Sequence, residues 1–151
     1  MKIEEVIKST GALSLNKRTL LNILYTQHQL AESIGEVLKP FDLSAEQYDV
    51  LCFLKDQKGI PANMCMIQEK MLSKTSNTTR LVNKLLLKKY VTREVCSENR
   101  RKIEVFITDA GLEAIRNLKP KIDFLEDHHA DNLTLQELKN LNLLLEKYRA
   151  A

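Results

Sequence analysis

The chain has 151 residues, of which 44% are apolar and 28% charged, a composition typical of one globular domain with a sizeable core. Glycine and proline are scarce and leucine is abundant, so we expect a mostly helical fold. No apolar run approaches the length of a membrane span, and the first residues lack the basic-then-apolar pattern of a signal peptide. These features predict a cytoplasmic protein.

The three cysteines, Cys52, Cys65 and Cys96, are widely spaced, odd in number and outside any C-x-x-C pattern. We therefore expect reduced and mostly packed thiols, and neither a disulfide framework nor a zinc site. Neither Cys65 nor Cys96 has an obvious activating neighbour, although Arg and Lys residues follow Cys96.

The formal net charge is only +3, but the charges are distributed unevenly. Residues 68–102 carry ten Lys and Arg against three Asp and Glu, a net charge of +7, whereas residues 1–67 have net −1 and residues 103–151 net −3. Such a basic central third favours a polyanionic partner, because phosphate neutralisation drives non-specific binding to nucleic acid. The alternative is a charged face that is merely solvated.

Apolar residues recur at helical spacing over residues 15–38, and Pro40 ends this first predicted helix. The apolar positions are Leu20, Leu24, Ala31, Ile34 and Leu38.

Ser44 and Gln47 have the spacing of a capping box for a second helix, which is expected to run to about residue 58. Its predicted inward-facing residues are Tyr48, Leu51 and Leu54. After a Gly-Ile-Pro break, Asn63 can cap a short third helix over residues 64–71.

A tight turn then leads to a helix over residues 76–88, whose start is rich in hydroxyl and amide side chains: Thr75, Ser76, Asn77, Thr78 and Thr79. Ser, Thr and Asn are indifferent helix formers, because their side chains compete for nearby backbone groups. An apolar stripe is expected to seat this helix on the core, and it comprises Leu81, Leu85 and Leu86. The cations beside the stripe are Lys84, Lys88 and Lys89.

Two segments with a period of two follow, one from Val91 to Val95 and one from Ile103 to Ile107. Between them lies the polar, cationic stretch SENRRK (97–102), so the pattern predicts a two-stranded ribbon with a basic tip.

Thr108 can cap a helix that runs to about residue 129, and Thr134 with Glu137 has the spacing of a capping box for a last helix. One stripe of the last helix carries Leu138, Leu141, Leu145 and Tyr148.

A helix, a tight turn, a second helix and a hairpin, in this order, predict a winged helix-turn-helix, a mainly α fold with a small β-hairpin wing. In this motif the second helix enters the major groove with its N-terminal residues at the base edges, and its N-terminus favours phosphate. Asn77 has the groups to read adenine through two hydrogen bonds, and Arg80 to read guanine or bind a phosphate. In the alternative interpretation the Ser and Thr residues are only caps of a surface helix.

The hairpin tip carries Arg100, Arg101 and Lys102, which on a short loop can reach an adjacent minor groove. A solvated turn with a chance basic run is the alternative. The predicted DNA-binding residues are Thr75, Ser76, Asn77, Thr79, Arg80, Lys84, Arg100, Arg101 and Lys102.

These segments resemble the MarR family of bacterial transcriptional regulators, over roughly residues 15–150. The resemblance is sharpest from LSAEQYDVLCFL (43–54) through residues 76–111. The family patterns T-R-L-V-D-x-L, L-V-x-R, D-R-R and L-T-x-A-G correspond here to TRLVNKL (79–85), YVTR (90–93), NRR (99–101) and ITDAG (107–111).

Several positions depart from the family pattern. Asn83 and Asn99 stand where relatives have Asp, so an Asp–Arg pair that braces the wing in relatives is expected to be weakened or absent. Lys89 stands where relatives have Gly, so it must tolerate the turn after the recognition helix, or the helix must end differently. Leu21 stands where peroxide-sensing relatives carry Cys, so neither Cys65 nor Cys96 is expected to be the primary sensor.

The resemblance implies one MarR-like domain over residues 1–151, with the winged helix-turn-helix at about 42–108 and dimerisation helices at about 15–39 and 109–150. It implies a homodimer that binds double-stranded DNA at a pseudopalindromic operator, usually as a repressor. It also implies release of DNA when a small, often phenolic or otherwise amphipathic, ligand enters the crevice between the lobe and the dimer helices. The Leu-rich terminal helices fit a dimer independently.

No catalytic motif is present: there is no G-x-S-x-G, no Gly-rich phosphate loop and no H-E-x-x-H. We therefore expect no enzyme, no cofactor and no metal. The stretch EDHHAD (126–131) is a metal-like cluster, but it falls at a helix junction where solvated polar residues are expected. His28 is a lone histidine and is expected in the core or at an interface.

Two other kinds of function stay open. A dimeric winged helix can bind protein instead of DNA, although a neutral or acidic recognition helix would then be expected. The chain can also be an activator, or a redox-responsive switch that acts through Cys65 or Cys96.

Overall fold

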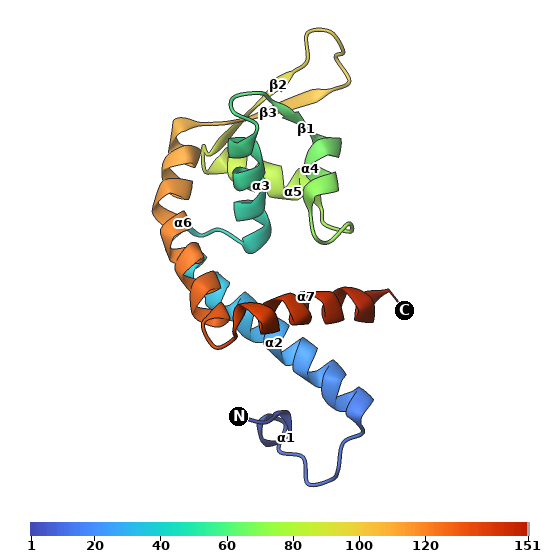
Figure 1. Cartoon of the computed structure of the whole chain (residues 1–151). Helices are drawn as coiled ribbons and strands as arrows, with labels where there is room; N and C mark the ends of the chain where they lie inside the picture. The colour runs from blue at the N-terminus through green and yellow to red at the C-terminus, as the bar shows by residue number, and fades with distance from the viewer. Residues whose placement is uncertain (151) are drawn as a thin grey trace. The chain divides into compact units, whose positions relative to one another are not determined.

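A computed structural model describes residues 1–150, which belong to two compact units, Met1–Ala45 and Glu46–Ala151. The chain is mostly helical with one small antiparallel sheet, as the composition predicts (Figure 1). The elements are α1 (Ile3–Val6), α2 (Leu15–Leu38), the 3-10 helix η1 (Lys39–Phe41), α3 (Ala45–Asp56), β1 (Ala62–Asn63), α4 (Met64–Lys70), α5 (Thr78–Leu87), β2 (Val91–Val95), β3 (Ile103–Ile107), α6 (Asp109–Ala130) and α7 (Leu135–Arg149). Among residues 1–150, no helix combines the length and the apolar character that crossing a membrane requires.

The first unit is built on α2, which has the predicted bounds. Ser14 caps its start by accepting a hydrogen bond from the Lys17 amide at 3.2 Å. Pro40 follows the last turn, where the chain continues as η1. Two residues of the predicted apolar stripe are largely uncovered, since Leu20 is 40% and Leu24 54% exposed.

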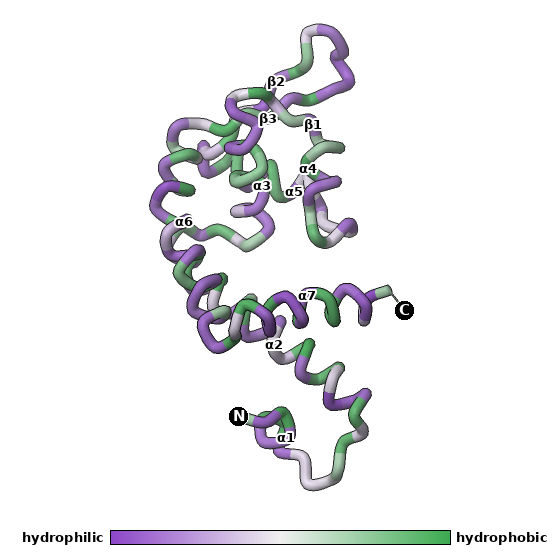
Figure 2. Tube along the Cα trace, viewed as in Figure 1, coloured by the Kyte–Doolittle hydropathy of each residue, from purple (hydrophilic) through white to green (hydrophobic). Residues whose placement is uncertain are grey.

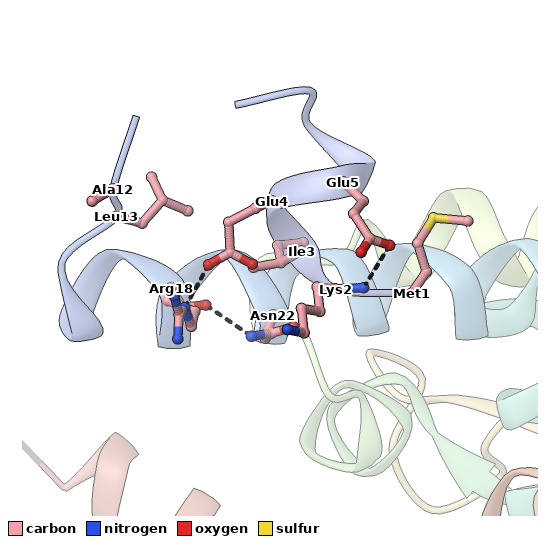
Figure 3. Close-up of a pocket in the computed structure, with 9 residues that line it drawn as sticks. All are labelled: Met1, Lys2, Ile3, Glu4, Glu5, Ala12, Leu13, Arg18 and Asn22. Atoms are coloured by element: carbon pink, nitrogen blue, oxygen red, sulfur yellow. Dashed lines mark hydrogen bonds and ion pairs between the residues drawn. The ribbon is translucent and has the colours of Figure 1, made fainter. Parts of the chain in front are cut away.

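A short helix that the sequence did not predict, α1, packs against α2 in the same unit. Ile3 is buried, and Glu4 forms an ion pair with Arg18 at 2.6 Å (Figure 3). A surface pocket of about 590 Å³ lies between α1 and the start of α2. The ion pair and the buried isoleucine therefore hold the first residues of the chain on the long helix.

The core of the second unit is apolar and formed by helices on a small sheet. The predicted inward face of α3 is confirmed, because Tyr48, Leu51 and Leu54 are all buried. The buried apolar residues of the other elements include Ile67, Val82, Leu85, Val91, Val105, Ile115 and Leu118.

The sheet has three strands in the order β1-β3-β2, so the prediction of a two-stranded ribbon was one strand short. β2 and β3 pair antiparallel with Val91 opposite Ile107 and Val95 opposite Ile103, as their period-two pattern indicated. The extra strand β1 pairs Ala62 with Val105. A two-residue strand has no alternation to detect, and Asn63 is also the N-cap of α4.

The joint between the hairpin and α6 is closely packed. Thr108 caps α6 as predicted, accepting from the Gly111 amide at 3.1 Å, and its hydroxyl donates to the Lys89 carbonyl at 2.7 Å. The Thr108 amide donates to the Tyr90 carbonyl at 3.0 Å. A Cβ on Gly111 would lie 2.4 Å from that same Tyr90 oxygen, so the first turn of α6 meets the hairpin backbone directly.

Lys89 occupies the left-handed turn after the recognition helix α5, with φ of 61°. The Lys89 amide donates to the Leu86 carbonyl and the Tyr90 amide to the Leu85 carbonyl, both at 3.0 Å. This pair of hydrogen bonds is a Schellman motif, which normally has Gly at the position of Lys89. Lys89 therefore tolerates the turn, one of the two outcomes expected from the sequence, and it does so in a strained conformation.

Replacing Lys89 by Gly should raise the free energy of unfolding by about 0.5–1 kcal/mol. The left-handed conformation costs a non-glycine residue about 1–2 kcal/mol, and the greater freedom of Gly in the unfolded chain offsets part of the gain. Urea denaturation of Lys89→Gly and the wild type measures the difference. The control is Lys88→Gly, one residue earlier at φ of −79°, which should not stabilise the protein. Stabilisation by both variants, or by neither, would contradict the strain at Lys89.

The helix α7 begins with the predicted capping box. Thr134 accepts from the Glu137 amide at 3.2 Å, and the Glu137 carboxylate accepts from the Thr134 amide at 2.8 Å. However, α7 buries none of its residues, and green apolar and purple polar segments alternate along it (Figure 2). Of the predicted stripe, Leu141 is 43% and Tyr148 49% exposed.

Candidate nucleic-acid interface

The recognition helix α5 is anchored through one face. Val82 and Leu85 are almost completely buried, with 1% and 0% exposure, while Leu81 and Leu86 are half-buried. The prediction for Leu85 is confirmed, and Val82 is an anchor that sequence reasoning missed. The opposite face exposes Arg80 and Lys84.

The polar residues at the start of α5 have different surroundings. Asn77 is the N-cap, and its Oδ1 accepts a hydrogen bond from the Arg80 amide at 3.0 Å, so the helix begins at Thr78 and not at residue 76. Thr78 is buried, with 6% exposure, whereas Asn77 and Thr79 are exposed. The cap of α5 is therefore Asn77, an exposed residue, and not one of the Ser and Thr residues that the alternative interpretation considered.

The turn before α5 is fixed by side chains from α3 and α4. The Ser76 hydroxyl donates to the Glu46 carboxylate at 3.1 Å. Gln68 on α4 donates from Nε2 to the Lys74 carbonyl at 2.7 Å, and its Oε1 accepts from the Thr78 hydroxyl. No local sequence pattern indicates Glu46 or Gln68, because their partners lie 30, 6 and 10 residues away.

The start of α4 lies between the start of α5 and the wing. A hollow of about 500 Å³ separates α4 from α5, and its lining includes Cys65, Asn77 and Thr79. A second hollow of about 160 Å³ separates α4 from the wing, and its lining includes Cys65, Arg101 and Lys102. Residues predicted on two separate elements therefore flank one turn of α4.

The wing tip is a defined turn. Beyond the last strand pair, the Cys96 amide donates to the Lys102 carbonyl at 2.9 Å, and the Lys102 amide to the Asn99 carbonyl at 2.9 Å. The Asn99 side chain accepts from the Arg101 amide at 3.1 Å. Arg100, Arg101 and Lys102 are exposed on this loop, which projects beyond the helices of the same unit and is mostly hydrophilic (Figures 1 and 2).

The predicted DNA-binding cations have no acidic partners within residues 1–150. Ion pairs among these residues include those of the cations Arg18, Arg116 and Lys119, none of which was predicted to bind DNA. The five predicted DNA-binding cations, which form no ion pair within this range, are Arg80, Lys84, Arg100, Arg101 and Lys102. Their charge is therefore available to an external anion.

The brace between recognition helix and wing is weak, as the sequence departures predict. Arg93 on β2 donates to the Asn83 side chain at 3.4 Å, at the long end of the hydrogen-bond range, and the neutral amide adds no ionic attraction. Asn99 is engaged in its own turn.

The histidines and cysteines that the sequence singled out lie outside α5 and the wing strands, and some of them are less buried than expected. His28 is exposed and not in the core, so half of that prediction was wrong. His128 stacks on the Phe124 ring at 5.9 Å, and within residues 1–150 no three His, Cys, Asp or Glu side chains are grouped as a metal site would require. Cys65 is exposed and not packed, whereas Cys52 is half-buried and burial raises its pKa.

Comparison with known proteins points to the same family as the sequence motifs. The MarR family model matches residues 43–103, while no curated protein sequence matches the chain. A MarR transcription factor from Planctomyces limnophilus is 28% identical, with a TM-score of 0.69 over 90% of this chain and 98% of that one.

Two more distant structures show the same fold. A mutant MarR from E. coli complexed with operator DNA is 22% identical, with a TM-score of 0.74 over 91% of this chain and 99% of that one. BpsR of Bordetella bronchiseptica, whose DNA binding is regulated by 6-hydroxynicotinic acid, is 18% identical, with a TM-score of 0.78 over 93% and 99%. The MarR family model thus matches the winged lobe, and these structures share the fold over most of the chain, so the chain is similar to MarR-family winged helix-turn-helix regulators.

Proposed function

We propose that this protein binds double-stranded DNA sequence-specifically as a homodimer, at a pseudopalindromic operator, and represses transcription there. The observation that carries the proposal is the group of exposed cations without ion pairs on α5 and the wing: Arg80, Lys84, Arg100, Arg101 and Lys102. Phosphate binding by such cations supplies affinity, and groups at the base edges supply specificity.

In the proposed complex the N-terminal half of α5 lies in the major groove. The exposed side chains there are Asn77, Thr79 and Arg80, preceded by Thr75 and Ser76 in the turn. Asn77 can keep its capping bond while its amide pairs with adenine, because a carbonyl oxygen accepts two hydrogen bonds. Lys84, two turns further along the exposed face, binds a phosphate.

The wing contributes the second set of contacts. Arg100, Arg101 and Lys102 enter or border the adjacent minor groove, and a narrow A·T-rich groove attracts the arginines. The turn that Asn99 stabilises holds these residues on a short loop, which limits the conformational entropy lost on binding.

The dimer is supported by apolar surface that the single chain leaves uncovered. In α7, Leu143 and Leu144 are 64% and 62% exposed, and in α6 Phe124 is 67% exposed. A symmetric dimer would present two recognition helices, and a pseudopalindromic operator mirrors that symmetry.

Regulation by a small molecule is part of the proposal. DNA binding by BpsR, which shares this fold, is regulated by 6-hydroxynicotinic acid. We propose a small amphipathic or phenolic effector for this chain, which lowers operator affinity by binding better to a conformation that does not fit DNA.

Capture of genomic fragments by the purified protein, followed by sequencing, tests the proposed function. The expected result is enrichment of a few fragments that share an inverted repeat close to a promoter. The control is the triple variant Arg100→Ala/Arg101→Ala/Lys102→Ala, which should enrich little. Failure to enrich any shared sequence would contradict sequence-specific DNA binding and favour a winged helix that binds protein.

Substitutions in the recognition helix and in the wing should affect DNA binding in different ways. Asn77→Ser keeps an oxygen for the helix cap but removes the amide, so it should lose about 1–3 kcal/mol on the operator and little on scrambled DNA. Arg101→Ala should weaken binding to both duplexes and lower the slope of log K against log salt by about 0.9, the value of one phosphate contact. Salt titrations of both variants on both duplexes provide the measurement.

The control for the cap is Asn77→Ala, which should show the same loss on the operator and an additional loss of helix stability of about 1 kcal/mol. If Asn77→Ser loses affinity equally on both duplexes, Asn77 binds phosphate and bases are read elsewhere.

A further inference from the structure

We propose that Gln68, a residue of α4 with no assigned role, is a positioning residue that sets the pose of the recognition helix and thereby the sequence specificity of DNA binding. The proposal rests on the proposed DNA-binding function. It concerns how the side chains that contact the bases are positioned, and not which side chains make those contacts.

The Gln68 side chain joins three segments of the helix-turn-helix. It belongs to the last turn of α4, and its Nε2 donates to the Lys74 carbonyl in the turn at 2.7 Å. Its Oε1 accepts from the hydroxyl of Thr78, the first residue of α5. One amide thus bonds both a turn carbonyl and the hydroxyl of Thr78, a residue that is only 6% exposed.

The segment that Gln68 spans has little regular structure of its own. Residues 71–77 lie outside helices and strands, and one backbone hydrogen bond inside the segment joins the Ser76 amide to the Ser73 carbonyl at 3.2 Å. A seven-residue connection of this kind does not by itself fix the direction in which the next helix begins. The direction must come from side chains that reach across the turn.

The two halves of α5 are held differently. Val82 and Leu85 pack the middle and C-terminal part into the core. The N-terminal end is held by polar contacts, the Thr78–Gln68 bond and the Ser76–Glu46 bond at 3.1 Å. Loss of the Gln68 contacts should therefore loosen the end that carries Asn77 and Thr79 while the packed half stays in place.

The consequence for DNA binding follows from the geometry of each contact. Base readout requires side chains held within about 0.5 Å of their productive positions, whereas phosphate attraction is long-range and tolerant. Lys84 and the wing cations are outside the segment that Gln68 holds. A loosened helix start should thus reduce discrimination between sequences and leave non-specific affinity nearly unchanged.

The test uses matched substitutions at both ends of the hydrogen bond. Gln68→Met keeps the length of the side chain but removes both polar contacts, and Thr78→Val keeps the shape of Thr78 but removes the hydroxyl. Each should lower affinity for the operator about 10- to 100-fold and affinity for scrambled duplex less than about 3-fold, with an unchanged salt slope. Thr78→Ser retains the hydroxyl and should bind like the wild type.

The double variant Gln68→Met/Thr78→Val should bind no more weakly than the worse single variant, because both changes remove the same contact. Equal loss on operator and scrambled duplex, wild-type discrimination by Gln68→Met, or additive losses in the double variant would each overturn the proposal.

Amide hydrogen exchange tests the role of Gln68 independently of the proposed DNA binding. In Gln68→Met, exchange at residues 74–80 should accelerate, while exchange at residues 82–87 should match the wild type. This result is measurable without DNA. Failure of every form to bind DNA specifically would overturn the proposed function alone, whereas unchanged exchange at residues 74–80 would overturn the role of Gln68.

Discussion

Substitution of Gly111 by Ala should lower the free energy of unfolding by about 2–4 kcal/mol, although Ala is the better helix former. The added Cβ would lie 2.4 Å from the Tyr90 carbonyl oxygen and 2.8 Å from Cγ1 of Ile107. The Tyr90 oxygen is a backbone atom, so no side-chain rotation relieves the contact. Moving it would also break its hydrogen bond with the Thr108 amide.

The control for Gly111→Ala is Gly35→Ala in α2. A Cβ there meets no atom within 4 Å, and Ala in a helix interior should stabilise the chain by about 0.5–1 kcal/mol. Urea denaturation at one fixed protein concentration measures both variants, since the midpoint of the proposed dimer would depend on concentration. A value for Gly111→Ala within about 1 kcal/mol of the wild type would show that the hairpin and α6 are not tightly joined.

Removal of residues 134–151 should abolish the proposed dimer and, with it, cooperative folding. The helix α7 buries no residue in the single chain, and a free helix of its 15 residues is marginal in water. Its capping box contributes only about 1 kcal/mol. We therefore expect α7 to be stabilised by a second copy of the chain, and we expect the truncated chain to aggregate or to melt without a sharp transition.

The mass in solution and the melting curve, measured for the full and truncated chains, test this expectation. A point variant avoids gross truncation: Leu141→Ser should shift the equilibrium to monomer, whereas Lys139→Ser, on the opposite side of α7, should not. A truncated chain that is soluble, monomeric and cooperatively folded would rule out an obligate dimer.

Features that depend on neighbours in the sequence were predictable. Asn63, Thr108 and Thr134 cap their helices as expected, because an N-cap bonds a backbone amide only three residues away. The hairpin was predictable because two segments with a period of two, residues 91–95 and 103–107, flank a polar stretch that favours a turn. The family motifs lie on these same segments, and the winged lobe followed from them.

Features that depend on distant residues were not predictable. β1 exists because Ala62 meets Val105, 43 residues later, and two residues carry no pattern of their own. Thr78 is buried, unlike the hydroxyl residues around it, and its hydroxyl bonds Gln68 across a turn without regular structure.

The amino-acid sequence by itself determined the longer helices, the caps at Asn63, Thr108 and Thr134, the hairpin and the basic central third, because propensity, capping and charge are local properties. Only the tertiary structure decided which of those residues act together. It placed Asn77 and Thr79 at one hollow beside the start of α4 and Arg101 and Lys102 at another, and it left Leu141, Leu143 and Leu144 of α7 exposed. Both results depend on how elements far apart in the chain pack, and packing is decided by the shapes of surfaces that no local pattern describes.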